Sequence, residues 1–228
     1  MIILIPARGG SKRLPNKNIY PLNGKPLICY TLDAIAEADL NIPTYVSTDD
    51  EKIAAIVHTF PNVEVVMRPA EFASDKASTE SVLFHLLDFL SKKGQSTDWL
   101  MTLPPTSPFR TAHTIRSFVE KAAACPDNID SLMSVTENRG DFWCMQDDGS
   151  MQRLFPNAPR RQQDRLPIFE ENSAVYLTRR QALVETGFIL GQTVHGVSIP
   201  VIEGFDINNF DDIILAECML DVIMKSTD

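Results

Sequence analysis

Short apolar runs alternate with amphipathic segments along most of this chain. Runs of four or five residues rich in Ile, Val, Leu and Thr predict buried β-strands at residues 2–5, 44–48, 63–66, 99–103 and 131–135. Apolar residues that recur every three or four positions predict helices over residues 26–38, 51–58 and 78–93, and from about residue 111. This alternation predicts an α/β fold, with a mainly parallel sheet covered by helices on both faces.

The alternation stops between residues 136 and 167, where polar residues and proline surround Phe142, Trp143 and Phe155. A long irregular insert in a compact domain is usually functional or part of an interface. Phe142 and Trp143 suit such an interface, but ordinary core packing remains an equal alternative. Strands are predicted again at residues 172–177 and 195–201, and a helix over 209–224 ends the chain. The length of 228 residues predicts a single domain spanning 1–228.

Composition excludes several classes of function. A formal net charge of −9 and a pI near 4.9 argue against nucleic-acid binding, because phosphate backbones favour basic surfaces. The four cysteines are widely spaced and form no C-x-x-C pair, which argues against a zinc or redox site and indicates a reducing compartment. The N-terminus does not resemble a signal peptide, and no segment approaches the roughly 20 apolar residues of a membrane span. We therefore expect a cytoplasmic protein with no membrane or nucleic-acid partner.

The opening sequence, IILIPARGGSKRLPNKN, places a glycine-containing basic loop directly after the first predicted strand. No Asp or Glu precedes Asp33, whereas five cations do: Arg8, Lys12, Arg13, Lys17 and Lys25. Glycines let backbone N–H groups approach an anion, and Lys and Arg balance its charge. The phosphate-loop patterns G-x-x-x-x-G-K-[ST] and G-x-G-x-x-G are both missing from this region. A polyphosphate site of another kind is predicted at the carboxyl end of this strand, rather than a solvated basic loop.

The segment IPARGGSKRLPNKNI resembles the signature of the CMP-sialic acid synthetase (acylneuraminate cytidylyltransferase) family. The resemblance continues in the family's order through five further blocks: STDD (47–50), RPAEFASD (68–75), PTSPFR (105–110), ENSAVYL (171–177) and FDINNFDDIILAE (205–217). It implies a three-layer Rossmann-like nucleotidyltransferase fold and a homodimer, with a small dimerisation excursion at about 136–167. The implied reaction is attack of the anomeric hydroxyl of a nonulosonic acid on the α-phosphorus of CTP, which gives a CMP-sugar and pyrophosphate.

The same resemblance assigns CTP to the first loop and to two later positions. The loop residues matched to the family's nucleotide site are Ala7, Arg8, Gly9, Gly10, Ser11, Lys17 and Asn18. Arg8 and Lys17 are expected to neutralise the phosphates during catalysis, whereas Lys12 and Arg13 either join them or face solvent. Arg68 is expected to recognise cytosine with Ser78 or Thr79. The alternatives are a salt bridge from Arg68 to Glu71 and an N-cap role for Ser78.

Phosphoryl transfer of this kind implies Mg²⁺, which takes carboxylate and phosphate oxygens. Asp206 and Asn208 match a pair of family aspartates, and Asp206 is expected to act in catalysis as a metal ligand. Asn208 can bind a metal through its carbonyl oxygen but brings no charge. Asp211 and Asp212 either compensate for this or form the acidic first turn of the last helix.

The sugar-binding residues implied by the resemblance are Pro104, Thr106, Ser107, Arg161, Arg165, Asn172 and Tyr176. Several of these segments depart from the family pattern: Pro104 replaces a glutamine, Gln162 an arginine and Ser173 a glycine. A substrate carboxylate favours a bidentate arginine, which Arg161 or Arg165 would supply. We expect a sugar other than N-acetylneuraminic acid. The alternatives are a KDO-type or other sugar nucleotidyltransferase and a non-catalytic nucleotide-binding homologue.

Overall fold

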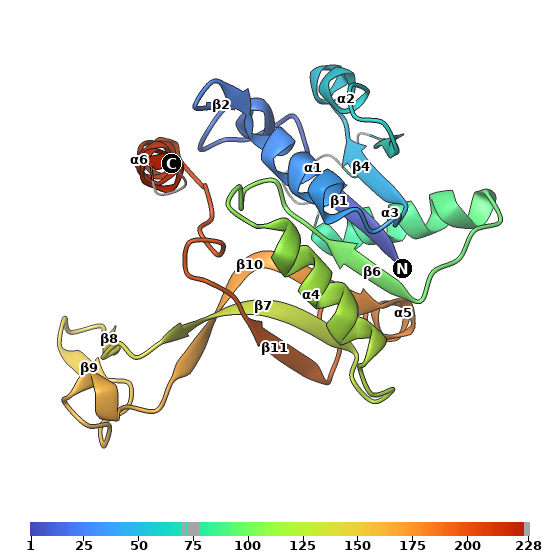
Figure 1. Ribbon diagram of the computed structural model, residues 1–228. Helices are drawn as coiled ribbons and strands as arrows, with labels where there is room; N and C mark the ends of the chain where they lie inside the picture. Colours follow the sequence, from blue (N-terminus) through green and yellow to red (C-terminus); the bar gives the residue numbers. More distant parts are fainter. Residues whose placement is uncertain (70–71, 73–77, 226–228) are drawn as a thin grey trace.

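A seven-stranded sheet forms the centre of the computed structural model, which describes residues 1–69, 72 and 78–225 (Figure 1). The strand order is β11-β7-β10-β6-β1-β4-β5. These strands are β1 (Ile2–Pro6), β4 (Thr44–Thr48), β5 (Val63–Met67), β6 (Trp99–Thr102), β7 (Ser131–Asn138), β10 (Ile168–Arg179) and β11 (Val194–Ser198). Strand β10 runs antiparallel to both of its neighbours, and the other neighbouring pairs are parallel. The prediction of a mainly parallel sheet is therefore confirmed.

Helices cover both faces of this sheet. They are α1 (Leu27–Ala38), α2 (Glu51–Val57), α3 (Thr79–Lys92), α4 (Ala112–Ala123), α5 (Arg180–Thr186) and α6 (Phe210–Lys225). Because successive side chains of a strand point to opposite faces, Ile3 and Ile5 of β1 pack in one core with α1 and α4. Ile2 and Leu4 pack in the other core with α3 and α5. The three-layer α/β prediction is confirmed.

Several local elements differ from the sequence-based expectation. Helix α5 lies just after β10, where no helix is predicted, and a small hairpin of β2 (Pro21–Leu22) and β3 (Lys25–Pro26) follows the basic loop. Strand β10 begins at Ile168 rather than at residue 172, and β7 extends to Asn138. These extensions carry polar residues and pair with each other, so cross-strand hydrogen bonds stabilise them in place of an apolar pattern. Among the residues described, no helix is long and apolar enough to cross a membrane.

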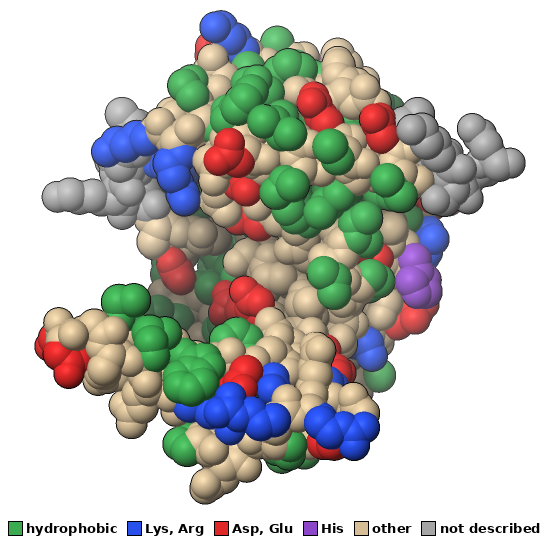
Figure 2. All heavy atoms as spheres, turned by 90° about the vertical axis from the view of Figure 1, so that its left-hand side faces the viewer, with side chains coloured by type: hydrophobic (Ala, Val, Ile, Leu, Met, Phe, Trp, Pro, Cys, Tyr) green, Lys and Arg blue, Asp and Glu red, His purple; other side chains and the backbone are tan. Residues whose placement is uncertain are grey.

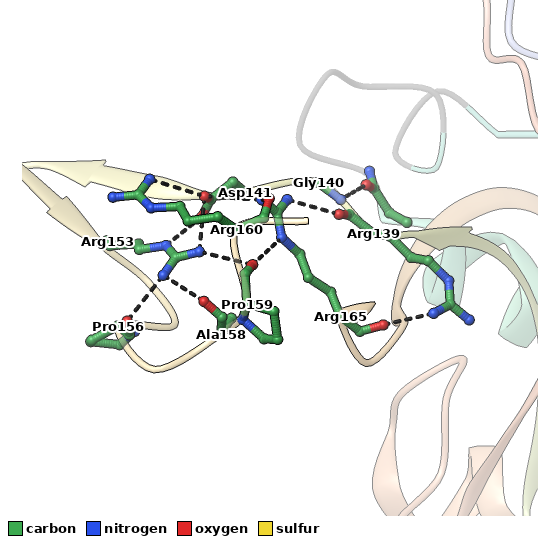
Figure 3. A network of polar contacts seen from close by, with 10 residues as sticks. Arg139, Gly140, Asp141, Arg153, Pro156, Ala158, Pro159, Arg160 and Arg165 are labelled. Atoms are coloured by element: carbon green, nitrogen blue, oxygen red, sulfur yellow. Dashed lines mark hydrogen bonds and ion pairs between the residues drawn. The ribbon is translucent and has the colours of Figure 1, made fainter. Parts of the chain in front are cut away.

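Residues 139–167 form an excursion, called the arm below, that projects from the far ends of β7 and β10 (Figure 1). It contains the hairpin of β8 (Trp143–Met145) and β9 (Met151–Arg153) and a 3₁₀ turn, η3 (Gln162–Asp164). Asp141 lies at its centre (Figure 3). Its carboxylate accepts two hydrogen bonds from Arg153, at 2.7 and 3.0 Å, and one from Arg165 at 3.2 Å. The hydrogen bonds from Arg153 lower the pKa of Asp141.

An ion-pair network around Asp141 therefore holds the arm together. Several apolar side chains of the arm are exposed. The exposed ones are Trp143, Met145, Met151, Leu154, Phe155 and Leu166. Core packing of Trp143, one of the two alternatives for this residue, is wrong because its side chain is 42% exposed. Figure 2 shows hydrophobic side chains on the arm and on the body beside it, with a hollow between the two parts.

A bulge in β10 places Ser173 at φ 59°, in the left-handed region that favours glycine. A non-glycine residue there costs about 1–2 kcal/mol. Ser173→Gly should therefore raise the free energy of unfolding by about 0.5–1 kcal/mol, after allowance for the greater freedom of glycine in the unfolded chain. Urea denaturation measures the change, and Ser173→Ala is the matched control because it keeps Cβ. A glycine variant less stable than the parent would contradict this explanation.

Candidate active site

A cavity of about 590 Å³ opens above the carboxyl end of β1. Its walls come from the basic loop, the start of α3 and the loop that follows β6. The lining residues are Pro6, Arg8, Ser11, Lys12, Arg13, Lys17, Asn18, Arg68, Ser78, Thr79, Val82, Pro104, Pro105 and Thr106. Five of them are Lys or Arg and, within the described part of the chain, none is Asp or Glu. In a protein of net charge −9, this cavity is suited to a small polyanion.

Contacts within the protein determine the shape of the basic loop. The buried Asn18 amide donates to the Arg8 carbonyl at 2.9 Å, and the N–H of Gly9 donates to Asp49 Oδ1 at 2.9 Å. A Cβ at Gly9 would lie 2.5 Å from an Asp50 carboxylate oxygen. Asp50 is not free to move away, because it is the N-cap of α2 and accepts from Lys52 N and Ile53 N. Glycine is therefore required at position 9 by close packing.

The structure brings together most, but not all, of the predicted nucleotide residues. Arg8, Ser11, Lys17 and Asn18 line the cavity, as do Lys12 and Arg13, whose position the sequence leaves open. Three predicted residues are not among its lining. Ala7 is buried beneath the loop, the N–H of Gly9 is directed to Asp49, and Gly10 is exposed.

Lys17 links the basic loop to the segment just before α6. It lies in a 3₁₀ turn, η1 (Lys17–Ile19), and its Nζ donates to the Ile207 carbonyl at 3.0 Å. Burial lowers the pKa of Lys17, and the nearby Asp206 carboxylate opposes this effect. The segment 206–208 is held against the cavity wall, because Ile207 N donates to the carbonyl of the lining residue Thr106 at 2.9 Å.

Arg68 and Ser78 lie at another part of the cavity lining. Arg68 follows β5, is buried, and donates to the Ser47 carbonyl at 2.6 Å. Burial lowers the pKa of Arg68, and Asp49 opposes the shift. Ser78 is the N-cap of α3 and accepts a hydrogen bond from Ser81 N, so the N-cap role is confirmed. Ser78 also lines the cavity, so a contact with the nucleotide remains a prediction. Glu71, the alternative partner of Arg68, lies outside the described residues.

The donor set near Asp206 suits magnesium in part. Within the described part of the chain, no group of three or more His, Cys, Asp or Glu side chains is arranged to hold a metal. Asp206 supplies one carboxylate near the cavity cation Lys17, which fits an ion that takes its other ligands from phosphates and water. The carbonyl oxygen of Asn208 accepts a hydrogen bond from Arg13 at 3.2 Å. Asp212 accepts from Asn208 N and Asn209 N in the acidic first turn of α6, the alternative role considered for it.

The predicted sugar residues fall into three places. Pro104 and Thr106 line the cavity, whereas Ser107 is buried with 1% of its surface exposed. Asn172 and Tyr176 flank the β10 bulge: the Asn172 amide contacts Ser134 and Thr136, and the Tyr176 hydroxyl contacts Glu171. Arg161 and Arg165 lie in the arm.

The two arm arginines differ in the contacts that they make. Arg161 is exposed and lies 3.7 Å from Asp164. Arg165 is engaged with Asp141 and with backbone carbonyls of the arm, including that of Pro159 at 2.8 Å. Neither arginine lines the cavity of its own chain.

Sequence reasoning overlooked two buried charged residues, Arg110 and Glu203. Arg110 supports the cavity wall by donating to the carbonyl of the lining residue Pro104 at 3.3 Å. Arg110 donates to the Ala174 carbonyl at 2.6 Å and to Thr31 Oγ1 at 2.8 Å. Glu203 accepts from Thr111 N at 2.9 Å and so caps α4 from a distant part of the chain. Arg110 lies within the PTSPFR block, so the sequence contained a signal for it; Glu203 lies in no recognised block.

Comparison with known proteins agrees with this geometry. The family model described as "Cytidylyltransferase" matches residues 2–142. The chain belongs to the cytidylyltransferase family. The N-acylneuraminate cytidylyltransferase of Streptococcus agalactiae is 32% identical to it over 197 residues, which are 84% of this chain and 46% of that protein. The chain therefore spans about half the length of this relative.

One further relative and one solved structure match this chain over nearly its whole length. The CMP-N,N'-diacetyllegionaminic acid synthase of Legionella pneumophila is 28% identical over 229 residues, 97% of each protein. The solved structure of CMP:2-keto-3-deoxy-manno-octonic acid synthetase complexed with CTP has a TM-score of 0.67 at 16% identity, and covers 96% of this chain and 98% of its own. That likeness confirms the Rossmann-like nucleotidyltransferase fold.

Proposed function

We propose that this cytidylyltransferase transfers CMP from CTP to the anomeric hydroxyl of a nonulosonic acid. The observation that carries the proposal is the cavity lined by Arg8, Lys12, Arg13, Lys17 and Arg68, which suits a triphosphate. The relatives that match this chain include proteins named for N-acylneuraminate and for N,N'-diacetyllegionaminic acid, both sugars of this class.

In the proposed reaction the sugar hydroxyl oxygen forms a bond to the α-phosphorus of CTP, and its proton passes to solvent. The bond between the α-phosphorus and the bridging oxygen breaks, and pyrophosphate leaves. Protein groups contribute mainly by positioning the reactants and balancing charge. Arg8 and Lys17 bind the phosphates, Ser11 donates to them, and Asn18 keeps the loop in shape through the Arg8 carbonyl. Arg68 and Ser78 face the cytosine.

Asp206 is the residue that we propose to hold Mg²⁺ together with phosphate oxygens. When bound, the ion would neutralise charge that develops on the phosphates as pyrophosphate leaves. The contact of Lys17 with the Ile207 carbonyl keeps the phosphate-binding cation next to this carboxylate.

The sugar is proposed to bind beside Pro104 and Thr106, which line the cavity at the loop that follows β6. Pro104 has no side-chain donor and no N–H, so this wall is less polar than the glutamine of the resembled family would make it. On this basis we propose a nonulosonic acid other than N-acetylneuraminic acid.

Release of pyrophosphate from CTP and a panel of acidic sugars in the presence of Mg²⁺ tests the function. The panel includes N-acetylneuraminic, N,N'-diacetyllegionaminic, pseudaminic and KDO acids, and ATP, GTP and UTP replace CTP in parallel reactions. Turnover that requires CTP and one nonulosonic acid supports the proposal, and preference for N-acetylneuraminic acid refutes the substrate assignment. Turnover with KDO identifies a KDO-type enzyme. CTP binding without turnover on any sugar identifies a non-catalytic homologue.

We also propose a homodimer in which the arm contacts the second copy. Apolar side chains are exposed on the arm, among them Met145 and Phe155, and on α6, among them Phe210 and Leu215. The arm and α6 both lie at the left of the molecule in Figure 1. Light scattering on the purified chain tests this assembly, and a monomer at micromolar concentration would refute it. The four cysteines are free thiols, which suits the proposed cytoplasmic location.

A further inference from the structure

Arg13 and Asn208 are 195 positions apart in the sequence but meet at the edge of the cavity. Arg13 Nη2 donates to Asn208 Oδ1 at 3.2 Å, and Asn208 Nδ2 donates to Asp206 Oδ2 at 2.6 Å. The backbone N–H of Asn208 donates to Asp212 Oδ2 at 2.7 Å. Asn208 is thus held by its backbone and by both ends of its side chain.

The chemistry of these partners determines the orientation of the Asn208 amide. A guanidinium group only donates hydrogen bonds, and a carboxylate only accepts them. A flipped amide would place its NH₂ group against Arg13 and its oxygen against Asp206, and both contacts would be repulsive. The carbonyl oxygen of Asn208 is therefore committed to a cation that the protein itself supplies.

A neutral amide orients Arg13 without cancelling its charge. A carboxylate at position 208, which the resembled family usually carries, would instead form an ion pair with the guanidinium and neutralise it. Arg13 lines the cavity together with four other cations, so its remaining donors are available to an anion there. Four of the five cavity cations, Arg8, Lys12, Arg13 and Lys17, belong to the basic loop. Their charge exceeds what a single metal-free phosphate group would balance, which points to a polyphosphate.

We infer that Asn208 is a positioning residue for Arg13, and that Arg13 binds the triphosphate of CTP directly. This inference rests on the proposed function and extends it. Asp206 is then the metal-binding side chain of this segment, and Asn208 contributes a hydrogen bond in place of a metal ligand. With Asn208 beside it, Arg13 keeps its positive charge for the phosphates. An aspartate at position 208 would bring a negative charge next to them.

Calorimetric titration of the full chain with CTP in EDTA tests the role of Arg13 without a metal. Arg13→Ala should weaken CTP binding about tenfold, as expected for loss of one charge-assisted contact. Asn208→Ala should weaken it about threefold, and the double variant should bind no more weakly than Arg13→Ala alone, because both changes remove one interaction. Asn208→Asp should weaken binding at least as much as Arg13→Ala. Lys92→Ala removes an exposed cation on α3 and should leave binding unchanged.

A second measurement follows Mn²⁺ binding to the CTP complex by electron paramagnetic resonance. Asn208→Ala should change the Mn²⁺ affinity by less than about twofold, whereas Asp206→Ala should lower it by about tenfold or more. Equal losses in the two variants would identify Asn208 as a metal ligand and overturn the inference. So would an Arg13→Ala variant that binds metal-free CTP like the parent. If the parent chain binds no CTP with or without metal, the proposed function itself fails.

Discussion

Lys17→Met should lower kcat/KM for CMP transfer by about 10²- to 10³-fold, the usual cost of removing one preorganised electrostatic donor. Lys17 is the cavity cation held at 3.0 Å from the Ile207 carbonyl, so its ammonium is already in place before CTP binds. Initial rates of pyrophosphate release measure the effect. Arg8→Ala should have a loss of similar size, because Arg8 lines the same cavity.

Lys25→Met is the matched control for Lys17→Met. Lys25 belongs to the same basic stretch but pairs with Asp33 and does not line the cavity. Its replacement should leave kcat/KM within about twofold, as expected of an exposed ion pair. A Lys17→Met variant with a nearly normal rate would remove Lys17 from the phosphate site.

Lys17 should also determine the pH above which CTP binding weakens. Burial lowers the pKa of Lys17 below 10.5, so its neutral form appears at lower pH than that of a free lysine. Because only the charged form attracts phosphate, CTP affinity should decline as pH rises towards 10.5. Lys17→Arg should move this decline to higher pH, since arginine keeps its charge above pH 12. An unchanged alkaline limit in Lys17→Arg would assign it to another group.

Arg110→Met should lower the free energy of unfolding by about 3–5 kcal/mol, the cost of breaking a buried charged network by removal of one member. Arg110 is only 2% exposed, and burial lowers its pKa while Glu203 opposes the shift. Its loss would leave the Ala174 carbonyl at 2.6 Å and the Thr31 hydroxyl at 2.8 Å without their donor. The expected fall in Tm is about 10 °C for a chain of this length.

Circular dichroism during heating measures this effect. Arg116→Met is the control, because Arg116 lies in the neighbouring α4 and donates to the Glu37 and Ala38 carbonyls from a half-exposed position. The control should change stability by about 1 kcal/mol or less. If Arg110→Met melted within about 2 °C of the parent, the network around Arg110 would carry little of the stability of the cavity wall.

Local patterns were enough to predict the elements that form the sheet. The run at residues 2–5 is apolar at every position, which is typical of a strand buried on both faces, and the structure places β1 between two cores. The polar ends of β7 and β10 have no such pattern. They pair because β10 returns alongside β7, and that pairing depends on the path of the chain through the arm.

In the candidate site, too, some residues could be predicted from local sequence and others depended on the tertiary structure. Arg8, Lys17 and Asn18 could be predicted because glycine and cations follow the first strand within one short loop. The assignment of Gly9 to the nucleotide site overlooked Asp49, 40 residues away, which accepts the N–H of Gly9. Ser107 lies in a recognised block, yet its side chain is buried, because a block of sequence does not specify which of its residues point into a cavity.

The sequence by itself determined an α/β chain with an isolated group of cations beside its first strand. The spacing of apolar residues and the local composition, which indicate these features, can be read over a few neighbouring residues. Only the tertiary structure decided that Lys17 contacts Ile207, that Arg13 contacts Asn208 and that Asp141 is surrounded by arginines. Two of these contacts join residues about 190 positions apart. Such pairs form because the chain after β11 returns to the loop that follows β6, where Ile207 N donates to the Thr106 carbonyl, and that path depends on packing of the whole chain.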